Sequence, residues 1–181
     1  MSYKIIRYDE SVAEMLPHKQ EPFDIIGRLV PIYNGKEWVT YEEFLDVPYT
    51  KTYRDDVYKT DKYIDNFDGA AFVAIFDGKC VGCLRISRRW NNNALVDDLL
   101  VDADHRGHGV GTMLMDAAVQ WSRENEYHGV SLETQDYNLL ACRFYIKYGF
   151  KLGGIDRHVN DAFDASRYET ALYFYLLPDN K

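Results

Sequence analysis

Cysteine and proline are scarce in this chain, and long apolar runs are missing. The 181 residues include 3 cysteines and 5 prolines. A small, odd number of cysteines predicts free thiols in a reducing compartment rather than a disulfide framework. No apolar run approaches the length of a membrane span. The first residues also lack the basic and apolar segments of a signal peptide. We therefore expect a cytoplasmic protein with no membrane partner.

Basic residues are in the minority. Lys and Arg number 21 against 29 Asp and Glu, which gives a formal net charge of −8. Binding to nucleic acid needs clustered Lys and Arg, so this balance predicts no nucleic-acid partner. Long-range attraction favours a cationic small molecule instead, although an acidic surface also serves solubility alone. The length suits a single domain, 1–181, with a sizeable core.

Metal and thiol chemistry have little support. Cys80 and Cys83 form a C-x-x-C pair, but they lie in a strand-like run rather than at a helix start, and no second ligand pair accompanies them. We expect both thiols to be structural. His105 and His108 flank Arg106 in a loop, and we expect exposed loop histidines there. We predict no metal site.

The most informative stretch joins a strand, a glycine-rich loop and a helix. Residues 95–101 are strand-like, and the loop reads Arg-Gly-His-Gly-Val-Gly over 106–111. From Gly111 the apolar residues follow helical spacing, which ends near Asn125. Glycines let a ligand approach the backbone, and unpaired N–H groups at a helix start attract anions. The glycine spacing fits neither a Rossmann fingerprint nor a Walker A loop. The stretch predicts a short pyrophosphate loop, while packing alone is the alternative.

The remaining pattern predicts one sheet with helices. Expected strands occupy 3–8, 70–76, 80–87, 130–134, 150–156 and 171–177, and a further helix spans 138–148. Asp77-Gly78 predicts a hairpin turn. The fold class is α+β, a three-layer α/β/α arrangement of a single mixed, mostly antiparallel sheet of about six to seven strands flanked by helices.

The N-terminal third differs in composition from the rest of the chain. Residues 19–36 contain Pro22, Pro31, Asn34 and Gly35, which predicts loop and turn with some buried apolar positions. Residues 38–68 interleave acidic and aromatic side chains, which predicts two helical pieces broken at Pro48. The acids either form a solvated helix face or line a wall for a cationic acceptor through carboxylate and cation–π contacts.

Three linked motifs resemble a known superfamily. Residues 96–101 read V-D-D-L-L-V, the loop contains R-x-x-G-x-G, and 138–150 read N-x-x-A-x-x-F-Y-x-x-x-G-F. Together they resemble the acetyl-CoA-binding core of the GNAT N-acetyltransferase superfamily over 70–177. The part before it, 1–69, would then supply an N-terminal strand and acceptor-side helices. The segments L-E-T-Q at 132–135 and L-G-G-I-D at 152–156 look like those of streptothricin acetyltransferases.

The resemblance implies an enzyme, an acetyl-CoA-dependent N-acetyltransferase that uses no metal. It implies direct attack in a ternary complex on an amine of a cationic small molecule, namely the β-lysine amine of streptothricin, and hence antibiotic resistance. Acceptors such as polyamines, aminoglycosides or peptide N-termini remain alternatives, as does a non-catalytic acyl-CoA sensor. The protein would be a monomer or a homodimer.

The resemblance also implies binding roles. The backbone of Leu99, Leu100 and Val101 would pair with the pantetheine arm like an added strand. Asn138 matches the motif's CoA-side asparagine. The pyrophosphate would be held by Arg106, Gly107, His108, Gly109, Val110, Gly111 and Thr112.

Tyr145 occupies the position of the family's general acid, which protonates the departing thiolate. A carboxylate must take a proton from the attacking amine, directly or through water. Asp97 stands where relatives carry a glutamate, and its shorter side chain favours a water relay. Asp98 would face the opposite side of the sheet unless a bulge intervenes. Glu133 is the third carboxylate, or alternatively the anchor for the substrate ammonium.

Overall fold

The computed structural model describes residues 2–9, 12, 22–52, 63–64, 66–162 and 169–178. The chain divides into two compact units. Unit 1 comprises Met1–Glu21, Tyr53–Val130 and Pro178–Lys181, and unit 2 comprises Pro22–Thr52 and Ser131–Leu177. Each unit is considered separately below.

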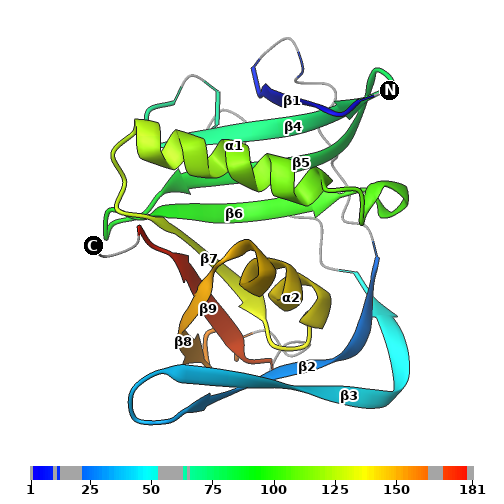
Figure 1. Ribbon diagram of the computed structural model, residues 1–181, viewed down its shortest axis with the longest axis vertical. Helices are drawn as coiled ribbons and strands as arrows, with labels where there is room; N and C mark the ends of the chain where they lie inside the picture. The colour runs from blue at the N-terminus through cyan, green and yellow to red at the C-terminus, as the bar shows by residue number, and fades with distance from the viewer. Residues whose placement is uncertain are drawn as a thin grey trace. The chain divides into compact units, whose positions relative to one another are not determined.

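Unit 1 is an antiparallel sheet covered by a helix (Figure 1). Its strands are β1 (Lys4–Arg7), β4 (Gly69–Phe76), β5 (Lys79–Arg88) and β6 (Ala94–Val101), and its helix is α1 (Val110–Glu124). Asp77 and Gly78 have φ angles of 50° and 73°, as the predicted hairpin turn between β4 and β5 requires. Helix α1 packs against β4, β5 and β6.

Helix α1 covers one face of the sheet of unit 1, where Ala74 of β4 and Leu114 and Met115 of α1 are fully buried. Ala71 and Val73 point to the other face of β4 and are buried in a cluster with Tyr63 and Cys83. The helical spacing of apolar residues after Gly111 predicted this face, because residues three and four apart share one side of a helix. Because that face packs on the sheet, the N-terminus of α1 and the glycine-rich loop that precedes it are held in place.

Unit 2 contains a two-stranded ribbon, a helix and three further strands (Figure 1). Its elements are β2 (Phe23–Tyr33), β3 (Trp38–Lys51), β7 (Val130–Gln135), α2 (Leu139–Tyr148), β8 (Lys151–Asp156) and β9 (Ala171–Leu176). The Asn138 side chain caps α2 by accepting a hydrogen bond from the N–H of Ala141. Gly149 ends the helix in the left-handed conformation at φ 116°, as predicted.

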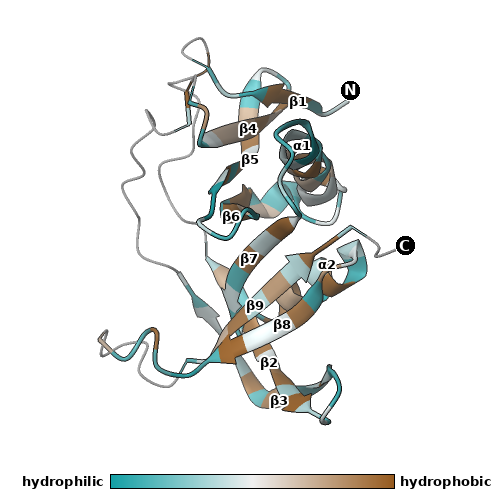
Figure 2. Ribbon diagram, turned by 90° about the vertical axis from the view of Figure 1, so that its left-hand side faces the viewer, coloured by the Kyte–Doolittle hydropathy of each residue, from teal (hydrophilic) through white to brown (hydrophobic). Residues whose placement is uncertain are grey.

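The helical prediction for 38–68 is wrong over 38–51, where the chain forms β3. Tyr, Thr, Val and Phe favour a strand there, and the long pairing with β2 decides the matter. Pro48 lies where the β2–β3 register shifts between Ile25 and Gly27, a position in a sheet that tolerates proline. Figure 2 shows both hydrophobic and hydrophilic segments along this ribbon. Residues 53–62 of the same prediction lie outside the described residues.

The prediction of loop for 19–36 is also wrong over 23–33, which form β2. Ile25 and Leu29 are 1% and 2% exposed and share one face of the strand. Pro31 pairs with Thr40 within the ribbon. The turn at Asn34 is as predicted, since its side chain accepts hydrogen bonds from the N–H groups of Lys36 and Glu37.

The strand order confirms the fold class. Seven strands form one mixed sheet in the order β1-β4-β5-β6-β7-β9-β8, and β2 with β3 forms the separate ribbon. The strands and helices predicted from residue 70 onwards are present within one or two residues of their expected bounds. Among the described residues, neither helix has the length and apolarity that crossing a bilayer requires.

Candidate active site

Two residues of the glycine-rich loop have backbone conformations that favour glycine. Gly107 and Gly109 have φ angles of 77° and 84°, a region in which other residues are strained. A Cβ at either position would meet nothing within 4 Å, so the space beside this backbone is open. Gly109 is the N-cap of α1. Because glycine has no side chain, Gly109 cannot accept hydrogen bonds from the first N–H groups of the helix. The loop therefore retains the features of an anion cradle.

Arg106 ties the loop to the end of β6. Its Nε donates a hydrogen bond of 2.9 Å to the carbonyl oxygen of Val101, one of the backbone groups predicted to pair with pantetheine. The side chain is exposed. The contact fixes the start of the loop relative to the strand before it.

The two loop histidines have local partners. His105 Nδ1 lies 3.0 Å from the hydroxyl of Tyr3, and its ring packs on Tyr3 and Phe76. His108 is exposed, and its Nδ1 lies 2.9 Å from the carbonyl oxygen of Arg106. No cluster of His, Cys, Asp or Glu suited to a metal ion occurs in the part of the chain that the structure describes.

A β-bulge separates the two aspartates of β6. Along β5 the register passes from Arg85 to Ile86, while along β6 it passes from Asp98 to Val96. Asp97 is therefore the extra residue, and the alternation of side chains is interrupted there. The sequence predicts that the two aspartates face opposite sides of the sheet unless a bulge intervenes. The structure contains that bulge.

The bulge gives the two acids different partners. The buried guanidinium of Arg85 donates to Asp98 Oδ2 at 2.6 Å, with side-chain exposures of 4% and 10%. Asp97 Oδ2 accepts a hydrogen bond of 3.2 Å from the hydroxyl of Tyr63. Asp98 is thus held in a buried ion pair, which is costly to disrupt once formed.

The other predicted site residues belong to unit 2. Tyr145 lies on α2, is 9% exposed and packs edge-on against Phe144 and Phe150. Glu133 is an exposed residue within the otherwise mainly buried β7. Asn138 serves as the cap of α2, a structural role that the binding prediction did not include.

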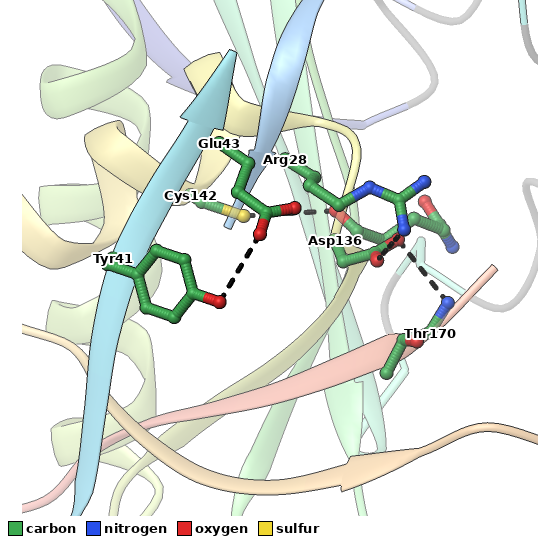
Figure 3. A network of polar contacts seen from close by, with 7 residues as sticks. Arg28, Tyr41, Glu43, Asp136, Cys142 and Thr170 are labelled. Carbon is green, nitrogen blue, oxygen red and sulfur yellow. Dashed lines mark hydrogen bonds and ion pairs between the residues drawn. The ribbon is translucent and has the colours of Figure 1, made fainter. Parts of the chain in front are cut away.

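Asp136 is a polar centre of unit 2 that sequence reasoning missed (Figure 3). Its carboxylate lies 3.6 Å from Arg28 and accepts a hydrogen bond of 3.3 Å from the N–H of Thr170. Its backbone bonds to Leu29 and Thr170, which links the turn after β7 to β2 and to the start of β9. Burial raises the pKa of Asp136, while Arg28 opposes this shift.

Two charged side chains of the ribbon, Glu42 and Lys51, have partners elsewhere in unit 2. Arg143 donates to both carboxylate oxygens of Glu42 and lies over the ring of Phe44 at 5.6 Å. Lys51 pairs with Glu169 and lies 4.1 Å from the centre of the Tyr137 ring. These contacts give part of the predicted acidic face an internal structural role.

The three thiols are free, as expected. Burial raises the pKa of both Cys83 and Cys142 to about 12. Cys80 is half-buried, and desolvation raises its pKa as well. Protonated thiols are poor nucleophiles, so the C-x-x-C pair contributes packing.

Comparison with known proteins agrees with this description of the fold. A family model, described as the acetyltransferase (GNAT) family, matches residues 37–150. The chain belongs to the acetyltransferase (GNAT) family and is an N-acetyltransferase by class.

Two curated relatives of this chain are streptothricin acetyltransferases. Streptothricin acetyltransferase A of Bacillus subtilis (strain 168) is 37% identical over 155 residues, covering 86% of this chain and 88% of the relative. Streptothricin acetyltransferase of Escherichia coli is 37% identical over 123 residues, covering 68% and 70%. The resemblance seen in the motifs is thereby confirmed.

Solved structures extend the likeness to the whole chain. A Bacillus anthracis protein assigned as a streptothricin acetyltransferase, crystallised with acetyl coenzyme A, has a TM-score of 0.89 at 30% identity and covers 99% of this chain and 100% of its own. A nourseothricin acetyltransferase has a TM-score of 0.80 at 30% identity, covering 98% and 99%. The predicted fold is therefore confirmed.

Proposed function

We propose that this N-acetyltransferase moves the acetyl group of acetyl-CoA to the β-lysine amine of streptothricin. The observation that carries the proposal is the 37% identity to streptothricin acetyltransferase A over 86% of the chain. The net charge of −8 supports a cationic acceptor.

The loop of unit 1 fits the pyrophosphate of acetyl-CoA. Its glycines have positive φ angles, and open space lies beside them, so a phosphate can approach the backbone N–H groups closely. Residues 106–112 would hold the pyrophosphate, and the backbone of 99–101 would pair with the pantetheine amides. Asn138 is assigned to the CoA side by the motif alone. Acetyl-CoA supplies an activated thioester.

The protein's own groups would then move two protons. An alkyl ammonium has a pKa near ~10 and must lose a proton before it can attack. Asp97 is the favoured acceptor of this proton, through water, because Asp98 is held in its ion pair with Arg85. Glu133 is exposed and suits the anchoring of the substrate ammonium. Tyr145 would protonate the leaving thiolate, since an ordinary tyrosine keeps its proton at neutral pH.

The acceptor assignment is tested by thiol release from acetyl-CoA with streptothricin and with a panel of polyamines, aminoglycosides and peptides. We expect the highest kcat/KM with streptothricin. Thiol release no faster than without acceptor would refute that assignment. Acetyl-CoA binding without transfer to any amine would indicate a sensor instead.

The acid is tested by Tyr145→Phe. This change keeps the buried ring and removes the phenol proton, so kcat should fall by ~10²-fold while acetyl-CoA binding stays nearly intact. Steady-state kinetics and calorimetric titration measure the two effects. An unchanged kcat, with chemistry rate-limiting, would remove Tyr145 from the role.

A further inference from the structure

The contact between Tyr63 and Asp97 links the acidic-aromatic stretch to the candidate base. Tyr63 and Asp97 are 34 residues apart in sequence, and the phenol donates to the carboxylate at 3.2 Å. The direction is fixed by chemistry, because an ionised carboxylate has no proton to donate. Tyr63 is not among the site residues expected from the sequence.

Tyr63 is held rigidly. It is 2% exposed and belongs to a core cluster of unit 1 with Tyr8, Ala71, Val73 and Cys83. A buried tyrosine ring has few orientations open to it in a packed core. Its hydroxyl is therefore a fixed donor rather than a mobile surface group.

Asp97 and its neighbour Asp98 are oriented in different ways. The register of β5 and β6 skips Asp97, so it lacks the regular cross-strand position that orients a strand side chain. Asp98 occupies the next position, directly opposite Arg85, and forms the buried ion pair with it. The bulge therefore takes Asp97 out of the regular β5–β6 pairing, and the Tyr63 hydroxyl supplies a fixed contact to its carboxylate.

The geometry points to Tyr63 as a positioning residue that holds Asp97 in the orientation needed to accept the proton of the acceptor amine. The inference rests on the proposed function, in which Asp97 is the base. Tyr63 acts through Asp97. Its hydroxyl donates to Oδ2 and restricts rotation of the carboxylate.

The inference is tested by Tyr63→Phe, which keeps the buried ring and removes the hydroxyl. We expect kcat to fall by about 10-fold, since small misplacements of a catalytic group cost rate, and KM for acetyl-CoA to stay unchanged. Kinetics refer to folded protein, whose concentration comes from titration with acetyl-CoA. Tyr127→Phe is the matched control in the same unit. The Tyr127 hydroxyl oxygen has no hydrogen-bond partner among the described residues, so this change should leave kcat unaltered.

A double-mutant cycle separates positioning from general structure. In an Asp97→Asn background, Tyr63→Phe should change the residual kcat by less than about twofold, because the group that it positions is gone. An equal loss of kcat in both backgrounds would overturn the inference, and so would an unchanged kcat of Tyr63→Phe alone. Absence of acetyl transfer by the wild type would overturn the proposed function and this inference together. If the wild type turns over normally and Tyr63→Phe leaves kcat unchanged, this inference alone would be overturned.

Discussion

At the residue scale, the neighbouring acids Asp97 and Asp98 differ in what holds them. Asp98 faces a buried guanidinium across the sheet, whereas Asp97 occupies a bulge and accepts from a phenol. Adjacent residues of the same type therefore have different physical roles. The sequence alone ranked them by likeness to relatives and by the alternation of side chains along a strand. Neither the bulge nor the partners of the two acids can be read from the local pattern.

Asp97→Asn and Asp98→Asn should separate activity from stability. Asp98→Asn leaves Arg85 buried without its counter-charge, and we expect a loss of about 3 kcal/mol in the free energy of unfolding. Asp97→Asn should instead lower kcat by about 10²-fold or more, with little effect on stability. Urea unfolding and steady-state kinetics on both variants measure this. A stable Asp98→Asn protein with a low kcat would transfer the base role to Asp98.

Asp136 predicts a pH dependence of stability. Burial raises its native pKa above the ordinary value of 3.8, so the native state binds this proton more tightly than the unfolded state does. The contribution of Asp136 to stability must then decrease as pH rises from the ordinary value through the raised one.

Asp136→Asn lacks this titration. The free energy of unfolding of the variant should therefore rise relative to the wild type as pH increases from 4 to 7. Urea unfolding of both proteins across that range is the measurement. If the free energy of unfolding of the variant instead falls relative to the wild type as pH increases, the ion pair with Arg28, rather than burial, determines the pKa of Asp136.

At the element scale, the β2–β3 ribbon depends on close approach of two backbones. A Cβ on Gly27 would lie 2.2 Å from the carbonyl oxygen of Glu43, and backbone cannot yield as a flexible side chain can. The approach occurs beside the register shift that accommodates Pro48.

Gly27→Ala should lower the free energy of unfolding by about 1–3 kcal/mol or more. The matched control is Gly154→Ala in β8 of the same unit, where an added Cβ meets nothing within 4 Å, with an expected change within about 0.5 kcal/mol. Thermal or urea unfolding compares them. Equal stability of both variants would show that the ribbon adjusts freely at Gly27.

At the scale of the whole molecule, the net charge of −8 should steer a cationic acceptor. With acetyl-CoA held saturating, kcat/KM for streptothricin should fall several-fold as salt rises from about 20 to 200 mM, because screening shortens the reach of the field. The kcat at saturating acceptor should change little. A kcat/KM that is insensitive to salt would leave solubility as the role of the charge.

The elements from 70 onwards were predictable because their signals are local. Asn138 caps a helix, Gly149 ends it, and Asp77-Gly78 turns a hairpin, each through the conformational preferences of a few neighbouring residues. Strand β3 was missed because its aromatic spacing also fits a helix. Strand β2 was missed because Pro22, Pro31 and the Asn34-Gly35 turn favour a loop. Only the long-range pairing of the two strands decides both cases.

By itself, the sequence determined the strand, glycine loop and helix of unit 1, the motif around Tyr145 and the likeness to streptothricin acetyltransferases. These depend on residue type and on spacing along the chain. Tertiary structure alone decided that Tyr63 reaches Asp97, that Arg85 pairs with Asp98 and that Asp136 links three segments. The physical reason is that a bulge and a register arise from pairing between distant segments, and a one-residue shift redirects every side chain beyond it.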